Sequence, residues 1–184
     1  MILSAFAKFP GEAAIIGRLL AGYTVLEIDL LNCVQMGVGD FDAVLKGLFR
    51  IRGEARRISV GAALGRPAYE GVNLEVDFDE AIAAMQHCRL IRNQYAHCNW
   101  WDDNSGKLAF ANLEDAAKEP TVVPDLLDLL PAHIDVPLLQ SQEAFYQYTD
   151  GLLAYVNYEG RKRANKPTGP VAKPALMAPP ALHL

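Results

Sequence analysis

The sequence predicts an all-α protein: an antiparallel helical bundle of about four long helices, with a small β-hairpin inserted before the last helix. Over most of the chain, apolar residues recur every three or four positions, which is the period of an amphipathic helix. Residues 99–111 break this pattern, with the turn signal Asn104-Ser105-Gly106 between two short β-favouring runs. The chain has 184 residues, of which 51% are hydrophobic, so it can bury one large core.

The same pattern divides the chain into a helical domain at residues 1–160 and a Pro-rich tail at residues 161–184. From Asn165 onward the sequence has five prolines and no helical period. Such a composition favours an extended segment that cannot form a core of its own. We therefore expect something outside the tail, such as a neighbouring molecule, to hold it in place.

Two predicted helices occupy the first third of the chain. The first begins at Pro10, with Glu12 near the positive end of the helix dipole, and stops at Gly37. Its apolar stripe is Ile16, Leu19, Leu20, Tyr23, Leu26, Leu30 and Val34, and the off-stripe residues Ile15, Val25, Ile28 and Leu31 predict cover on a second side. The second helix starts after the N-cap Asp40 and ends at turn signals that begin with Gly65. Its stripe is Phe41, Leu45, Leu48, Ile51, Ala55, Ile58 and Ala62.

Two more long helices complete the predicted domain. Asp77, with Glu80 three residues on, resembles a capping box that starts the third helix. This helix runs to about Cys98 and leads into the hairpin. The Pro-rich stretch that follows predicts a loop with one short helical piece at residues 125–130. The fourth helix covers residues 138–158, and its inward residues are Leu139, Tyr146, Thr149, Leu153 and Val156.

Composition and charge exclude several classes of protein. The formal net charge is −5, so the molecule as a whole is not a nucleic-acid binder, and any polyanion must meet a local basic patch. Cys33, Cys88 and Cys98 cannot all pair with one another and predict reduced thiols in a cytoplasmic protein. No basic leader precedes the apolar N-terminus, and charged residues interrupt the next apolar run, so we expect neither a secretory signal nor a membrane span.

The third helix has two faces that both predict contacts. At about 100° per residue, one face carries Ala84, Cys88, Ile91, Tyr95 and Cys98 and belongs to the core. The opposite face begins with Phe78, Ile82 and Met85 and finishes with Gln86, Arg89, Asn93 and His97. Because a simple surface helix is polar on its outer side, we expect a second contact surface there, against another helix or a twin subunit. The polar residues would then lie at the mouth of a partly dry groove.

Arg92, Asn93 and His97 form a set that could act on a phosphodiester. Arg92 could hold the non-bridging oxygens in a bidentate grip. His97 could move the proton of a ribose 2′-OH or of the leaving 5′-oxygen, and Asn93 could orient the imidazole or the substrate. This chemistry needs no metal or cofactor, but it needs RNA, because DNA lacks the attacking hydroxyl. Alternatively, the three side chains tie the helix end to the next loop through hydrogen bonds.

The run RNQYAH, residues 92–97, resembles the Arg-x4–6-His signature of the HEPN superfamily, with a polar residue directly after the arginine. The resemblance implies a compact helical bundle, commonly a homodimer, that cleaves RNA without a metal in toxin–antitoxin, phage-defence or RNA-processing systems. It also implies that Arg92 and His97 are catalytic, that Asn93 supports them, and that two copies of the motif meet at the dimer interface. A cognate antitoxin or regulatory protein is then an expected partner.

The chain departs from the family pattern at Asn99, where some toxin members carry a tyrosine two places after the histidine. An antitoxin mechanism that modifies this tyrosine is therefore not expected. Some members have lost activity, which implies an alternative function: a non-catalytic helical module that binds a protein or a nucleotide.

Four further residues are candidates for substrate binding: Arg89, Glu27, Tyr23 and Trp100. Glu27 lies one turn after Tyr23 in a very apolar helix, and it either faces the groove as a partner for Arg89 or Arg92 or is exposed. Trp100 either stacks on a base or packs the hairpin, and packing is the favoured interpretation.

The densest basic run consists of Arg50, Arg52, Arg56 and Arg57. Glu54 lies among them, which favours a salt-bridged surface; contact with an RNA backbone is the alternative. The pairs His87-Cys88 and His97-Cys98 suggest metal ligands, but ten residues of helix separate them by about 15 Å. We therefore expect no metal site.

Overall fold

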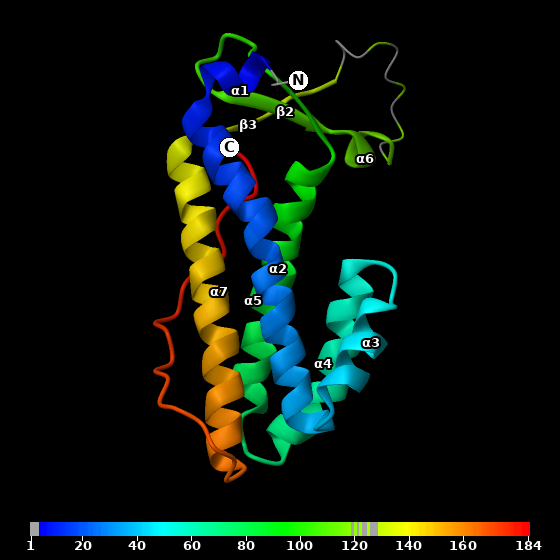
Figure 1. The fold of residues 1–184 in the computed structure, drawn as a ribbon. Helices are drawn as coiled ribbons and strands as arrows, with labels where there is room; N and C mark the ends of the chain where they lie inside the picture. Colours follow the sequence, from blue (N-terminus) through cyan, green and yellow to red (C-terminus); the bar gives the residue numbers. More distant parts are fainter. Residues whose placement is uncertain (1–3, 119, 121, 123–124, 126–128) are drawn as a thin grey trace. The chain divides into compact units, whose positions relative to one another are not determined.

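The computed structural model describes residues 4–118, 120, 122, 125 and 129–184 of the chain. This described part contains seven helices and three strands, so the predominantly helical character predicted from the sequence is confirmed. The chain divides into two compact units. Unit 1 consists of Met1–Ala21, Leu90–Ala144 and Pro180–Leu184, and unit 2 consists of Gly22–Arg89 and Phe145–Pro179. Figure 1 labels the helices and strands along the chain.

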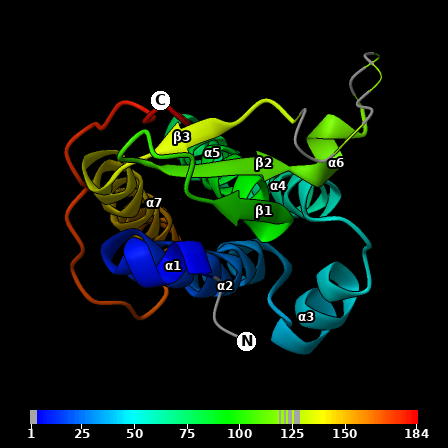
Figure 2. The same ribbon diagram turned by 90° about the horizontal axis from the view of Figure 1, so that it is seen from above.

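Unit 1 contains a three-stranded antiparallel sheet in the order β1-β2-β3 (Figure 2). The strands are β1 (Cys98–Trp101), β2 (Leu108–Asn112) and β3 (Ala132–Ile134). Trp100 pairs with Phe110, and Ala109 pairs with His133. The predicted hairpin is confirmed, but β3 adds a strand where the sequence predicts a loop. Three residues are too few to show a strand period, so pairing with β2 decides the conformation of β3.

Aromatic rings attach the hairpin to the helices of unit 1. The ring of Trp100 has its centroid 5.4 Å from that of Phe6, 5.7 Å from that of Tyr95 and 5.2 Å from that of Phe110. Phe6 belongs to α1 (Ser4–Lys8), a short helix that the sequence does not predict. Phe6 therefore serves as cover for β1 of the sheet. Directly after β2 the chain forms α6 (Leu113–Ala116).

Unit 2 is built from helices. α3 (Phe41–Phe49) and α4 (Glu54–Glu70) lie wholly within it, whereas α2 (Pro10–Val38), α5 (Glu75–Ala96) and α7 (Val136–Arg163) contribute residues to both units. α4 packs closely on α5 because Gly65 has no side chain: a Cβ there would lie 3.0 Å from the ring of Phe78. Phe78 stacks on Tyr69 with ring centroids 4.4 Å apart. The hydroxyl of Tyr69 donates to the carbonyl of Cys33 at 3.1 Å, which fixes the ring within the core.

The single second helix predicted from the sequence is wrong, because a short non-helical segment separates α3 from α4. Gly53 ends this segment with a φ of 84°, a conformation that glycine adopts readily and that a right-handed helix cannot contain. The break also changes which residues face the core. Leu48 and Ile58 are buried as predicted, whereas Phe41 and Leu45 are exposed.

Several large apolar side chains of unit 2 are exposed: Val25, Ile28, Val38, Phe41, Leu45, Phe49 and Leu64. Val25 and Ile28 are each 50% exposed. The sequence predicts that a second side of the first helix is covered. In the described chain, Val25 and Ile28 on that side are not covered.

The boundaries of α5 differ from the prediction at both ends. The helix begins at Glu75, so Asp77 lies in its first turn and is not an N-cap, and it ends at Ala96. Cys98 is consequently the first residue of β1 and only half-buried. The rest of the predicted core face is confirmed, because Ala84, Cys88, Ile91 and Tyr95 are buried.

α7 is longer than the predicted fourth helix at both ends. Asp135 Oδ1 accepts a hydrogen bond from the amide of Leu138 at 3.0 Å and so caps the first turn. The five predicted inward residues, Leu139, Tyr146, Thr149, Leu153 and Val156, are all buried. The helical piece predicted at residues 125–130 falls mainly on residues 126–128, which lie outside the described residues.

Beyond Arg163 the tail forms no helix or strand. In unit 2 it is held by Lys173, whose Nζ lies 2.6 Å from Asp77 Oδ1 and 2.8 Å from Glu80 Oε2. The residues that the sequence suggests as a capping box therefore bind the tail instead. Among the helices described here, none combines the length and the apolar character that a bilayer-spanning segment needs.

Candidate active site

The end of α5 is tied to the start of α6 through Asn112. Its Nδ2 donates to the carbonyls of Asn93 at 2.9 Å and Gln94 at 3.3 Å, and its Oδ1 accepts from the amides of Glu114 at 2.9 Å and Asp115 at 3.2 Å. One side chain thus satisfies carbonyls left unpaired at the end of one helix and amides left unpaired at the start of the next. The last turn of α5 is fixed relative to α6.

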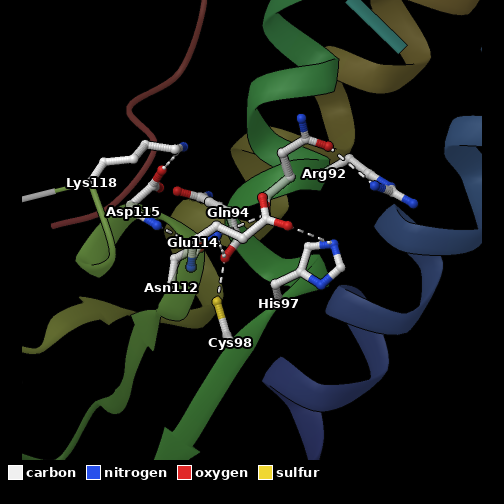
Figure 3. A network of polar contacts seen from close by, with 9 residues as sticks. Arg92, Gln94, His97, Cys98, Asn112, Glu114, Asp115 and Lys118 are labelled. Carbon is white, nitrogen blue, oxygen red and sulfur yellow. Dashed lines mark hydrogen bonds and ion pairs between the residues drawn. The ribbon is translucent and has the colours of Figure 1, made fainter. Parts of the chain in front are cut away.

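His97 follows α5 directly and has its main chain and side chain in different environments. Its carbonyl accepts from the amide of Leu113 at 3.1 Å. Its Nε2 lies 3.6 Å from Oε1 of Glu114, and the two side chains are 55% and 63% exposed (Figure 3). The backbone of His97 is therefore fixed, while its imidazole remains accessible to solvent beside a carboxylate.

Arg92 lies one turn before the end of α5 and is half-buried. Its guanidinium Nη1 donates to Oδ1 of Asn93 at 3.2 Å. In Figure 3 the side chains of Arg92 and His97 extend toward the same side of the view. Asn93 thus uses its amide oxygen to orient the guanidinium.

Cys98 and Gln94 lie on the inner side of this junction. The thiol of Cys98 donates to the carbonyl of Gln94. Burial raises the pKa of this thiol to about 12, so it stays protonated at neutral pH and is a poor nucleophile. Gln94 is buried, and its Nε2 donates to the carbonyl of Leu182 in the tail at 2.7 Å. Neither residue presents a reactive group to the exposed side.

The structure separates the predicted site residues into two sets. Unit 1 contains Arg92, Asn93, His97 and Trp100, whereas Tyr23, Glu27 and Arg89 belong to unit 2. Trp100 is half-buried and packs among the aromatic rings described above, which agrees with the hairpin-packing interpretation.

The unit 2 set forms local contacts of its own. Glu27 forms an ion pair with Arg57 of α4, not the predicted pair with Arg89 or Arg92, and the Arg57 guanidinium lies over the ring of Phe49, 4.5 Å from its centroid. Arg89 Nε donates to Gln86 Oε1 at 2.9 Å. The carboxylate of Glu27, a candidate for the substrate groove, is thus paired with an arginine of α4.

Tyr23 is buried in the same unit, and burial raises the pKa of its hydroxyl above the usual range. Within the described part of the chain its hydroxyl has no hydrogen-bond partner.

The described residues contain no group of three or more His, Cys, Asp or Glu side chains placed to bind one metal ion. His87 instead packs edge-on against Phe145, with ring centroids 5.3 Å apart.

Sequence reasoning missed two residues of the site, Asn112 and Glu114. A local signal for them exists, because an asparagine followed two and three positions later by Glu114 and Asp115 is typical of a helix N-terminus. The signal marks α6, but only the fold brings this N-terminus against the end of α5. Comparisons of the chain with protein-family models, with curated proteins and with solved structures give no significant match.

Proposed function

We propose that the chain is a metal-independent endoribonuclease of HEPN type that acts as a cytoplasmic homodimer, with Arg92 and His97 at its centre. The observation that carries the proposal is the exposed imidazole of His97 beside the carboxylate of Glu114, next to the helix end that bears Arg92. Asn112 and the amide of Leu113 already tie the end of α5 to α6. The exposed imidazole of His97 is therefore not needed for that link.

In the proposed reaction, an imidazole takes the proton of a ribose 2′-OH, and the 2′-oxygen attacks the adjacent phosphorus. The bond between phosphorus and the 5′-oxygen breaks, and a second imidazole gives a proton to the leaving oxygen. The products are a 2′,3′-cyclic phosphate and a 5′-hydroxyl. A second copy of the chain supplies the second imidazole, so the proposal requires a homodimer.

The other residues of the site support this step. Arg92 holds the non-bridging phosphate oxygens and stabilises the charge that grows on them in the transition state. Asn93, bonded to the guanidinium at 3.2 Å, keeps the guanidinium in position. Glu114 restrains the orientation of the imidazole. Substrate binding is not assigned to the other four candidates. Tyr23 is buried, Glu27 pairs with Arg57 and Arg89 donates to Gln86, all within unit 2. Trp100 packs among aromatic rings.

The proposal extends to the fold and to the biological role. We propose that the long helices that contribute to unit 2, α2, α4, α5 and α7, form an antiparallel bundle of HEPN type. The resemblance of residues 92–97 to the family signature supports a role in a toxin–antitoxin or phage-defence system, with a cognate antitoxin or regulatory protein as partner.

The test is cleavage of a single-stranded RNA by the purified full chain in the presence of EDTA. We expect products that end in a 2′,3′-cyclic phosphate. His97→Ala should lower the rate by about 100-fold or more, because a general acid–base group typically contributes that much. Arg92→Lys should lower it by about tenfold or more, because the planar fork is lost although the charge remains.

Two control variants separate these effects from general damage. His183→Ala removes an exposed histidine of the tail, and Arg66→Lys changes an arginine paired with Asp79 on the surface of unit 2. Both should cleave RNA at the native rate. Undiminished cleavage by His97→Ala, or no cleavage by the native chain, would count against the nuclease.

A non-catalytic helical interaction module is the second candidate. The exposed apolar residues Phe41, Leu45 and Phe49, spaced four apart on α3, favour it, because exposed apolar patches often mark protein contacts. This candidate predicts concentration-dependent association that Leu45→Asp weakens, without RNA cleavage. Sedimentation of the native chain and this variant measures the association.

A further inference from the structure

The segment Pro180–Leu184 of the tail lies against unit 1 and is held through its main chain. Gln142 Nε2 donates to the carbonyls of Ala181 at 2.8 Å and Leu182 at 2.9 Å. Gln94 Nε2 donates to the carbonyl of Leu182 at 2.7 Å. These two glutamine amides thus bind two consecutive peptide carbonyls.

The sheet adds a fourth bond. The amide of Leu184 donates to the carbonyl of His133 at 3.0 Å, and His133 belongs to β3, an edge strand of the sheet. One main-chain bond thus joins the segment to an edge strand, the kind of bond on which β-strand addition relies. His133 is itself positioned by Asp103, 2.7 Å from its Nε2.

The glutamine donors are buried and preorganised. Gln142 is fully buried, with 0% of its surface exposed. Its Oε1 accepts from the hydroxyl of Tyr95 at 2.7 Å, which fixes the amide so that its NH2 group points at the segment. With the segment in place, its carbonyls pair donors that would otherwise be buried without an acceptor, which is costly. The two glutamine amides are thus suited to an extended peptide.

The segment buries little of its own side-chain surface. The side chains of Ala181, His183 and Leu184 are exposed, and that of Leu182 is half-buried. Pro179 and Pro180, which precede the bonded residues, have no amide N–H to pair. Its attachment therefore rests mainly on the four hydrogen bonds to its main chain. Another extended peptide that offers the same carbonyls and N–H can form the same bonds, so it can replace the segment.

We propose that Gln94, Gln142 and the main chain of His133 form a binding site for extended peptides, and that residues 180–184 are its exchangeable intramolecular ligand. The peptide class is defined by two consecutive carbonyls that accept from the glutamines and an N–H two residues further on that donates to the sheet edge. The exposed side chains make few demands on sequence. This inference does not depend on the proposed nuclease activity.

The test uses a fluorescein-labelled peptide with the sequence of residues 178–184 and measures its binding by fluorescence anisotropy. It compares the native full chain with a full-length variant whose own segment is disabled by Leu182→Asp, which places a charge on the half-buried side chain, and Leu184→Pro, which removes the N–H that donates to His133. The native segment competes from within the same molecule at an effective concentration of about millimolar. We expect the peptide to bind the disabled variant at least about tenfold more tightly than the native chain.

Adding Gln142→Leu to the disabled variant provides the specificity control, because leucine keeps the approximate size and removes both donated bonds. It should abolish binding of the peptide. Absence of saturable binding to a disabled variant that still unfolds cooperatively would overturn the proposal, as would equal binding with and without Gln142→Leu.

If the disabled variant does not fold, amide exchange in the native chain decides the question. The amide of Leu184 should exchange about tenfold or more slowly than in the free peptide, and Gln142→Leu should remove this protection. Equal exchange in the native chain and the peptide would refute the site.

Discussion

The imidazole Nε2 of His97, the residue directly after α5, lies 3.6 Å from Oε1 of Glu114 in α6. Both side chains are more than half exposed, so the pair is screened by water and worth less than about 1 kcal/mol. Glu114 can therefore bias the orientation of the imidazole but cannot immobilise it. A catalytic role for His97 thus requires a further contact from substrate or from a second copy of the chain.

Glu114→Gln should accordingly have a small effect on the proposed RNA cleavage. Because an exposed ion pair contributes less than about 1 kcal/mol, we expect kcat/KM to fall by no more than about fivefold. The difference between native chain and variant should shrink as salt is raised. A loss as large as that of His97→Ala would show that the carboxylate acts directly on the substrate, contrary to the proposal.

Asn112 should be important for stability because it serves two helix ends. Asn112→Ala removes the cap of α6 and the two bonds to the carbonyls of Asn93 and Gln94, and we expect the free energy of unfolding to fall by about 1–3 kcal/mol. Asn112→Asp keeps the cap but replaces the donating amide with a carboxylate that faces those carbonyls. Denaturant unfolding should show that it is also destabilising. A neutral Asn112→Asp would mean that the bonds to α5 contribute nothing.

Gly160 should tolerate no side chain. A Cβ there would lie 2.8 Å from Tyr69 Cε1 and 2.9 Å from Met36 Cε, and the ring of Tyr69 is fixed by its stacking on Phe78. Gly160→Ala should lower the free energy of unfolding by about 1–3 kcal/mol. Gly47→Ala is the matched control: its added Cβ meets nothing within 4 Å, and it should stabilise α3 by about 0.5–1 kcal/mol. Equal effects of the two changes would contradict the close approach of Gly160 to Tyr69 and Met36.

Asp29 should make stability fall as the pH rises. Burial, then the hydrogen bond and charge of Asp150, raises the pKa of Asp29 to about 7. The pKa of an unfolded aspartate is about 4, so between about pH 4 and 7 the unfolded chain ionises while the folded chain keeps its proton. The contribution of Asp29 to the free energy of unfolding therefore declines across that window and levels off above pH 7.

Asp29→Asn removes this dependence, so the variant should gain stability relative to the native chain as the pH is raised from 5 to 8. Thermal unfolding at several pH values measures the gain. Asp42→Asn, at an exposed position of α3, is the control and should show no such trend. A constant difference between Asp29→Asn and the native chain across the range would refute the raised pKa.

Much of the helical fold could be predicted from local pattern. The inward residues Leu139, Leu153 and Val156 of α7 are buried because a helical period places them on one face. The break between α3 and α4 was missed because an apolar period of threes and fours continues across residues 50–53, whereas the positive φ of Gly53 interrupts the helix. β3 was missed because a three-residue strand depends on its partner for its conformation.

Only the part of the candidate site that lies at the end of α5 could be predicted from the sequence. Arg92 and Asn93 lie in the last part of α5 and His97 follows it directly, so the apolar period of one helix is enough to bring the three together. Asn112 and Glu114 are far from them along the chain, and the hairpin brings them to the end of α5. Glu27 shows the converse: its ion pair with Arg57 depends on α4 packing beside α2, which spacing within one helix cannot reveal.

The sequence by itself determined that the chain is mainly helical, that a hairpin follows the third long helix, and that an arginine, an asparagine and a histidine gather at that helix's end. These features follow from interactions among neighbouring residues, which repeat with the period of the helix or strand. Only the tertiary structure decided that Glu114 faces His97, that Asn112 joins two helix ends, and that buried glutamines hold residues 181 and 182 of the tail. Such contacts join segments distant in sequence, and they form because buried polar groups and unpaired helix ends must find partners wherever the folded chain provides them.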